Sequence, residues 1–134
     1  MVCQVAAGLE RYFPHLNKVI INADLRSIRP EWVRYLGQTV FKELEFVTPL
    51  YSRNEYDGTI TNHLCYPLLH SVLGRDIRQP IGGDFAFSGR LLEHWMRQDW
   101  GEYVLPYGVD IFMTSEAVLS GYSVAQVTQG SKIH

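Results

Sequence analysis

The chain has 134 residues, of which 46% are hydrophobic and 19% are charged, a balance that is typical of a globular domain. The formal net charge of −2 gives no basic field, so the charge does not support a nucleic-acid partner. No apolar run approaches the roughly 20 residues that a membrane-spanning helix needs. Cys3 and Cys65 lie far apart within apolar patterns, and we expect them to be free, buried thiols in a cytoplasmic protein.

Hydrophobic spacing, prolines and glycines divide the chain into alternating helices and strands. We expect Pro14 to end the first helix, Pro30 to open the second, Pro49 to stop a strand and Gly121 to cap the last helix. Together these elements predict one α/β domain over residues 1–134. In chain order they are a helix at 2–13, a strand at 18–22, a helix at 30–40, a strand from residue 44, helices at 59–73, 90–96 and 109–119, and a strand at 122–130.

The predicted helix at 59–73 has a regular apolar pattern. Pro67 lies inside it and is expected to kink or restart the helix. Its apolar residues recur at helical spacing, at Ile60, Leu64, Leu68 and Val72.

Asp24 follows a β-branched run and precedes the proline-started helix. A carboxylate just past the carboxyl end of a strand lies in the crevice where open α/β sheets bind ligands, and hard divalent cations take oxygen ligands. Asn22 lies two residues earlier, on the same face of an extended chain, and offers an uncharged amide oxygen. A turn-capping role for Asp24 fits the local pattern equally well.

The segment RQPIGGDF at 78–85 places two adjacent glycines between polar side chains. Gly82 and Gly83 can take positive φ and let the backbone approach a ligand. Gln79 and Asp84 carry groups that are able to hydrogen-bond to sugar hydroxyls. A plain turn between two extended segments is the alternative interpretation.

Other candidate residues lie in three separate segments. Arg53 has the forked geometry that suits a carboxylate or phosphate, and Thr61 follows it near a helix N-terminus, which favours anions. A solvated loop with Asp57 as the helix cap explains this segment as well. Asp110 near the start of a helix is ordinarily explained by dipole capping, and His134 is the last residue, where a side chain is commonly untethered.

Taken in order, NADLRSIRPEWV, SRNEYDGTIT, RQPIGGDF, YGVDIFMTS and QGSKIH resemble motifs of the sugar-nucleotide-dependent glycosyltransferases of the GT-A fold. The nearest resemblance is to the retaining group that contains mannosylglycerate synthase and glucosyl-3-phosphoglycerate synthase, and it covers most of the chain from Val19 onward. It implies a mixed α/β sheet flanked by helices. It also implies a divalent cation (Mg²⁺ or Mn²⁺), a nucleotide-diphosphate sugar as donor and a small, glycerate-like acceptor that bears a carboxylate or phosphate.

The resemblance implies a role for each candidate residue at the cation and the reacting groups. NADLRS is similar to the family's Asp-x-Asp segment, so Asn22 and Asp24 would hold the cation together with His134. Asp110 matches an acid near the sugar and acceptor hydroxyls. Asp24 and Asp110 are therefore the implied catalytic residues.

The two substrates are assigned in the same way. Arg53 and Thr61 match the positions that hold the acceptor carboxylate. The segment QPIGGD is similar to the one that lines the transferred sugar, so the implied donor-sugar residues are Gln79, Ile81, Gly82, Gly83 and Asp84.

Two features depart from the family pattern. The first acid of the Asp-x-Asp pair is Asn22 here, which removes one charge from the cation site. In the family, several βα units that bind the nucleotide precede this segment, whereas 21 residues precede Asn22. The stretch at 6–24 is itself similar to the family's first helix and second strand. We therefore hypothesise a seam near 22–24 that joins two separated family segments and leaves the nucleotide-binding part incomplete.

Three functional hypotheses follow from the sequence. The leading one is a metal-dependent glycosyltransferase core that acts with retention. A non-catalytic remnant that binds sugar or nucleotide, or serves as an assembly subunit, is favoured by Asn22 and by the incomplete nucleotide-binding part. A metal-dependent nucleotide-sugar hydrolase would keep the cation site without needing Arg53 and Thr61. A homo-oligomer is compatible with the sequence.

Overall fold

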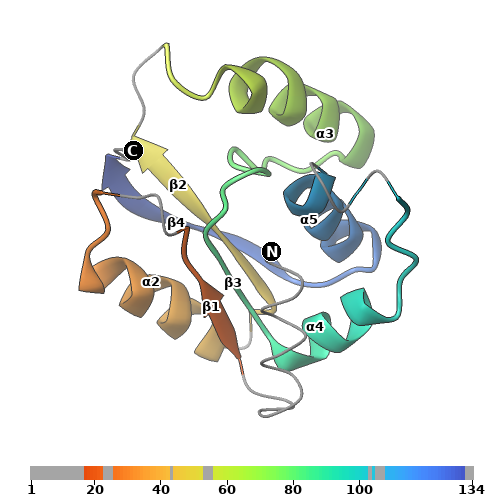
Figure 1. Ribbon diagram of the computed structural model, residues 1–134, viewed down its shortest axis with the longest axis horizontal. Coiled ribbons are helices and arrows are strands. Elements are labelled where there is room, and N and C mark those ends of the chain that lie inside the picture. The colour runs from red at the N-terminus through yellow and green to blue at the C-terminus, as the bar shows by residue number, and fades with distance from the viewer. Residues whose placement is uncertain are drawn as a thin grey trace.

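The structure, a computed structural model, describes residues 17–22, 26–42, 44–52, 56–102, 104 and 108–131. A four-stranded sheet lies between helices on its two faces (Figure 1). In chain order the elements are β1 (Lys18–Ile20), α2 (Pro30–Phe41), β2 (Phe46–Ser52), the π-helical turn η1 (Thr61–Cys65), α3 (Tyr66–Leu73), β3 (Phe85–Phe87), α4 (Gly89–Met96), α5 (Val109–Leu119) and β4 (Val124–Ser131).

Strands β1, β2 and β4 run in the same direction. The strand order is β1-β3-β2-β4, in which β3 pairs antiparallel with β1 and β2, and β2 pairs parallel with β4. The carboxyl ends of β1, β2 and β4 therefore meet at one end of the sheet, where β3 begins. We call this the carboxyl end of the sheet.

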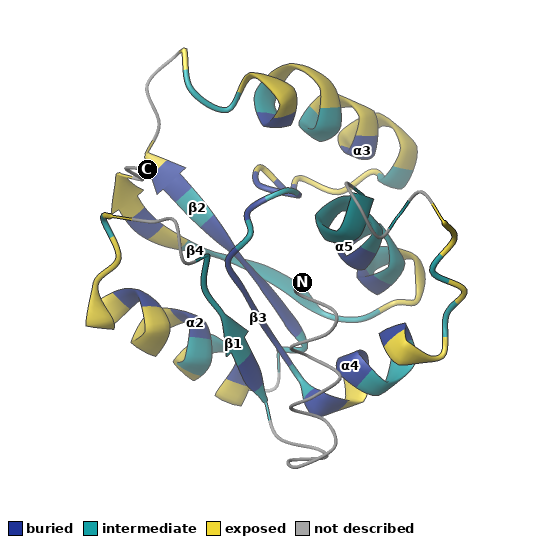
Figure 2. Cartoon of the chain, in the orientation of Figure 1, coloured by how far each residue is buried: buried dark blue, intermediate teal, exposed yellow. Residues whose placement is uncertain are grey.

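The sheet separates two apolar clusters, because successive strand residues point to opposite faces. One face packs against α4 and α5 through Phe46, Phe85 and Phe87, and the other packs against α2 through Val47 and Ala86. All five side chains are fully buried (Figure 2), and a buried phenylalanine contributes roughly 1.5–3 kcal/mol to stability. The hydrophobic pattern does not predict β3, because three residues are too short to show a period.

The prediction that Pro49 stops a strand is wrong, because β2 continues through it. The Phe46 N–H donates to the Ser123 carbonyl on the β4 side (3.0 Å), and N–H directions alternate along a strand, so the Pro49 nitrogen faces the β3 side. The pairing of β2 with β3 covers Phe46 and Val47 and ends before Pro49, so no ladder hydrogen bond is lost. Gly82 lies against the proline here, since a Cβ on it would lie 3.1 Å from Pro49 Cγ.

The predicted helix at 59–73 is present and is divided. The turn η1 has π-helical hydrogen bonds, and α3 starts at Tyr66, immediately before Pro67. The backbone stays helical through Cys65 and Tyr66, so the hydrogen-bond pattern changes from π to α there without a break. Pro67 lies in the first turn of α3, where its missing N–H costs little. Leu69 is buried on the inner side of α3, whereas Leu64 and Leu68 are exposed.

The later predicted elements are confirmed with small changes in bounds. At the start of α4, the Ser88 hydroxyl accepts a hydrogen bond from the Leu91 N–H (3.1 Å), which caps the helix. Helix α5 has the predicted bounds, and Gly121 follows it with φ 78° while its N–H donates to the Val118 carbonyl (3.1 Å). Strand β4 extends to Ser131.

Cys65 is a free thiol that is partly buried, and this burial raises its pKa. The predicted helix at 2–13, with Pro14 and Cys3, lies outside the described residues. Of the helices that are described, none is both long and apolar enough to cross a bilayer.

Replacing Gly82 with alanine tests the packing against Pro49. Gly82→Ala should lower the free energy of unfolding by about 1–3 kcal/mol, because the added methyl group overpacks the proline ring. Gly101→Ala is the matched control, since a Cβ there meets nothing within 4 Å. Urea denaturation of both variants checks this, and equal stabilities would contradict the close packing at Gly82.

Candidate functional site

Asp84 lies at the carboxyl end of the sheet, immediately before β3, and its side chain has no exposed surface. Asn22 follows β1 by two residues, and Tyr51 is the last residue but one of β2. Strand β3 lies between β1 and β2 and is antiparallel to both. This strand order brings the start of β3 next to the ends of β1 and β2, and so brings Asp84, Asn22 and Tyr51 together.

Both carboxylate oxygens of Asp84 accept hydrogen bonds from the flanking strands. The backbone N–H of Asn22 donates to Oδ1 (2.6 Å), and the hydroxyl of Tyr51 donates to Oδ2. A buried carboxylate is costly without such donors, and each hydrogen bond to a charged group contributes about 1.5–3 kcal/mol. The carboxylate therefore ties the ends of β1 and β2 to the start of β3.

The glycine pair forms the loop just before Asp84. Gly83 has φ 71°, a left-handed conformation that side chains other than glycine rarely adopt, and a Cβ on it would lie 3.4 Å from the Asn22 side-chain nitrogen. Its N–H donates to Oδ2 of Asp110 (3.0 Å). The loop thus lies between the Asn22 amide and the Asp110 carboxylate, and Gly82 packs on Pro49.

Helix α5 holds the same loop at a second point. Asp110 lies in the first turn of α5, and Thr114 lies one turn further along, where its hydroxyl donates to the Pro80 carbonyl (2.9 Å). Gln79 is 3% exposed and Ile81 is half-buried. Every predicted donor-sugar residue therefore belongs to one loop that is packed between the sheet and α5.

The structure brings together Asn22, the QPIGGD segment and Asp110. Thr61 is buried in η1, which precedes α3. Asp24, Arg53 and His134 lie outside the described residues, so their predicted roles stay predictions. Within the described ranges, no group of three or more His, Cys, Asp or Glu side chains is arranged to hold a metal ion.

The hypothesis of a seam near 22–24 also stays a prediction. Strand β1 ends at Ile20, which pairs with Phe85 of β3, and the described chain continues through Asn22 before the gap at 23–25.

Sequence reasoning missed Tyr51 and its neighbours. The Trp32 ring lies 5.5 Å from the Tyr51 ring, at an interplanar angle of 46°. Gln129 of β4 is buried and donates from Nε2 to the Trp32 carbonyl (3.3 Å), while its Oε1 is buried and has no hydrogen-bond partner in the described part of the chain. A tyrosine at the end of a buried strand is a weak signal, because its partner Asp84 lies 33 residues away.

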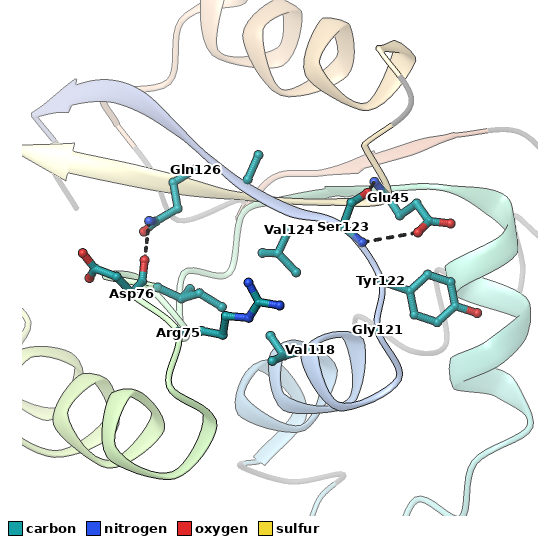
Figure 3. A pocket seen from close by; sticks show the side chains of 11 residues that line it. Glu45, Arg75, Asp76, Val118, Gly121, Tyr122, Ser123, Val124 and Gln126 are labelled. Atoms are coloured by element: carbon teal, nitrogen blue, oxygen red, sulfur yellow. Dashed lines mark hydrogen bonds between the residues drawn. The ribbon is translucent and has the colours of Figure 1, made fainter.

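A cavity lies elsewhere in the described part of the chain. Its volume is about 490 Å³, and Glu45, Arg75, Tyr122 and Val124 are among its lining residues (Figure 3). It opens at the amino ends of β2 and β4, and no predicted site residue lines it. Open α/β sheets bind their ligands outside the carboxyl ends of the strands, so the end that carries Asp84 is the better candidate site.

Comparisons with known proteins give matches among solved structures, whereas no family model and no curated protein matches the chain. Glucosyl-3-phosphoglycerate synthase from Mycobacterium tuberculosis in complex with phosphoglyceric acid is similar with a TM-score of 0.74 at 22% identity, over 99% of this chain and 45% of the synthase. The same enzyme in complex with Mn²⁺, uridine diphosphate and phosphoglyceric acid gives a TM-score of 0.73 at 22% identity, over 99% and 44% of the two chains. A structure described as a mycobacterial protein gives 0.73 at 24% identity, over 99% and 42%.

These matches show the fold of the chain. The GT-A-like α/β fold predicted from the ordered motifs is confirmed, and so is the predicted resemblance to the glucosyl-3-phosphoglycerate synthase group. The chain spans less than half the length of the synthase chains that it matches.

Removing the Tyr51 hydroxyl tests the carboxylate bridge. Tyr51→Phe should destabilise the protein by about 1–3 kcal/mol, because the buried Asp84 loses a donor that water cannot replace there. Tyr56→Phe is the matched control, since Tyr56 is 84% exposed. Thermal and urea unfolding measure both variants, and a Tyr51→Phe protein as stable as its control would refute the bridge.

Proposed function

We propose that the chain is the catalytic core, or part of the core, of a GT-A glycosyltransferase. It would move a sugar from a nucleotide-diphosphate sugar to a small anionic acceptor, with retention. The observation that carries the proposal is the convergence of Asn22, the Gly82–Gly83 loop and Asp110 at the carboxyl end of the sheet. The fold match to glucosyl-3-phosphoglycerate synthases supports it, since the structures matched include complexes with uridine diphosphate, Mn²⁺ and phosphoglyceric acid.

A divalent cation would be held by Asp24 and His134, with the Asn22 amide oxygen beside them. The position of Asn22 supports this choice of cation ligands, because its side chain lies next to the glycine loop at the carboxyl end of the sheet. Strands β1 and β4 both end there, and the segments that carry Asp24 and His134 follow those strands directly. Oxygen and imidazole ligands suit Mn²⁺ and Mg²⁺. When bound, such an ion supplies electrostatic stabilisation of the leaving diphosphate.

The QPIGGD loop would line the transferred sugar. Its backbone can approach a ligand closely because neither glycine carries a side chain. Asp84 already accepts hydrogen bonds from Asn22 and Tyr51, so its main part in this scheme is to hold the loop in place. Gln79 and Ile81 would complete the wall around the sugar.

Arg53 and Thr61 would hold the acceptor. Arg53 follows the carboxyl end of β2 by one residue, and a guanidinium binds a carboxylate or phosphate with two parallel hydrogen bonds. Holding the acceptor next to the donor contributes to catalysis through positioning.

Asp110 would orient the reacting hydroxyl rather than act as a separate base. Its Oδ2 accepts from the Gly83 N–H, so the carboxylate is fixed beside the glycine loop. In a retaining transfer of the proposed kind, the acceptor hydroxyl attacks on the face that the diphosphate leaves. The departing phosphate oxygen can then take the proton.

Calorimetric titration tests the donor and cation sites. We expect the chain to bind UDP or GDP, or one of their sugars, more tightly with Mn²⁺, and Asp24→Asn and His134→Ala to reduce this gain by about tenfold or more, because each removes a ligand of a hard cation. Asp99→Asn and His63→Ala are the controls, since both side chains are exposed. Nucleotide binding that ignores Mn²⁺ would count against the proposed site.

Restoring the family's first acid gives a gain-of-function test. Asn22→Asp should tighten Mn²⁺ binding by about tenfold, because a second carboxylate adds an attractive charge next to the cation. Titration of the chain with Mn²⁺ alone measures this. An unchanged affinity would place the cation away from Asn22.

A hydrolase is the second candidate, and the acceptor residues separate it from a transferase. Arg53→Ala and Thr61→Val should abolish transfer to a glycerate-like acceptor and leave the slow release of free sugar from the donor unchanged. Product analysis with and without acceptor measures both rates. A hydrolase would keep its full rate in these variants and show no transfer in the unaltered chain, and a binding remnant would bind donor without any turnover.

A further inference from the structure

The cavity at the amino ends of β2 and β4 has the size of a small-molecule site. Its volume of about 490 Å³ lies within the roughly 300–1,000 Å³ that ligand pockets usually occupy. Its walls come from Glu45 before β2, from the segment at 75–77 after α3, and from the end of α5 and the start of β4 (Figure 3). The glycine loop lies at the other end of the sheet, so a ligand here would be neither the donor nor the acceptor of the proposed transfer.

One wall of the cavity is held in place by the side chain of Gln126 in β4. Its Oε1 accepts a hydrogen bond from the Arg78 N–H (2.7 Å), and its Nε2 donates to the Asp76 carbonyl (2.8 Å), as Figure 3 shows. Ile77, between these two residues, is buried. The segment after α3 is therefore fixed against β4, and Arg75 is held at the cavity.

The guanidinium of Arg75 is available to a ligand. In Figure 3 its side chain reaches into the cavity, toward Val118 and Val124. Among the described residues it has no hydrogen-bond, ion-pair or ring partner, whereas the guanidinium of Arg78 lies over the Tyr66 ring, 4.1 Å from its centroid. A guanidinium without a partner is the group that binds a carboxylate or a phosphate.

The two carboxylates that line the cavity already have partners. Glu45 pairs with Arg90 (2.6 Å) and accepts a hydrogen bond from the Ser123 N–H (3.3 Å). Asp76 accepts a hydrogen bond from the Tyr66 hydroxyl (2.8 Å). The charge that remains available at the cavity is therefore positive, which favours an anion over a cation.

The surroundings of Arg75 favour a carboxylate over a phosphate. A phosphate monoester carries close to two negative charges at neutral pH, and the carboxylates of Glu45 and Asp76 at the same cavity would repel the second charge. A carboxylate carries one charge and matches the guanidinium with two parallel hydrogen bonds. Val118 and Val124 add apolar wall, which suits a ligand with an apolar body.

We propose that this cavity binds a small carboxylic acid with an apolar body, and that its carboxylate pairs with Arg75. The proposal rests on the volume of the cavity, the available guanidinium and the partners of the two carboxylates. It is independent of the proposed glycosyltransferase activity, because no residue of the proposed donor, acceptor or cation sites lines the cavity.

Titration of the ¹⁵N-labelled full chain with sodium benzoate, followed by NMR, tests the site. We expect saturable shifts of the Arg75, Val124 and Ala125 amide signals, with a roughly millimolar dissociation constant, as is usual for so small a ligand. Benzamide has nearly the same shape without the charge, so it should bind at least about tenfold more weakly. Inorganic phosphate, titrated in the same way, should bind more weakly than benzoate.

Two variants locate the site. Arg75→Gln should weaken benzoate binding by about tenfold or more, because the charged hydrogen bonds are lost. Arg97→Gln is the matched control, since the Arg97 side chain is 79% exposed and lies outside the cavity. Val118→Phe should also weaken binding, because the larger ring fills the space that the ligand needs. Circular dichroism establishes that each variant is folded.

Four results would overturn the proposal. These are the absence of saturable shifts at the cavity residues, equal binding of benzamide and benzoate, binding of phosphate as tight as that of benzoate, and an Arg75→Gln protein that binds benzoate as tightly as its Arg97→Gln control.

Discussion

The carboxylate of Asp84 is the constraint on which the candidate site depends. It is fully buried between two strands, and it accepts hydrogen bonds from the backbone after β1 and from the side chain at the end of β2. Removing either donor from a buried charge is costly. The carboxylate therefore links the end of β1 and the end of β2 to the start of β3.

The same hydrogen bonds to Asp84 help to hold the glycine loop in place. Asp84 fixes one end of the loop, and α5 fixes the remainder through Asp110 at Gly83 and Thr114 at Pro80. A loop that is held at three successive points loses little further entropy when a ligand binds, and a site that positions a sugar benefits from such preorganisation. The left-handed φ of Gly83 carries no steric penalty, because glycine has no Cβ.

Local patterns predicted the described helices and the edge strands β1 and β4 well, since proline starts, glycine ends and helical spacing act over a few residues. They did not predict β3, whose burial comes from strands on both sides, or the passage of β2 through Pro49, which depends on where the ladder with β3 ends. The candidate site residues in QPIGGD were visible in the sequence. The hydrogen bond between Tyr51 and Asp84 was not visible in the sequence, because only the order of the strands in the sheet brings these two residues together.

That order also explains why residues from distant parts of the chain are candidates for one site. The three parallel strands β1, β2 and β4 all deliver the chain to the carboxyl end of the sheet. The segments with Asp24, Arg53 and His134 each begin within a few residues of those strand ends. In a parallel sheet, strands that are remote in sequence end side by side, so the segments that follow them start from neighbouring points. For this reason the spacing of 110 residues between Asp24 and His134 in the chain is no obstacle to a shared cation, and the order of the motifs carries more information than any one of them alone.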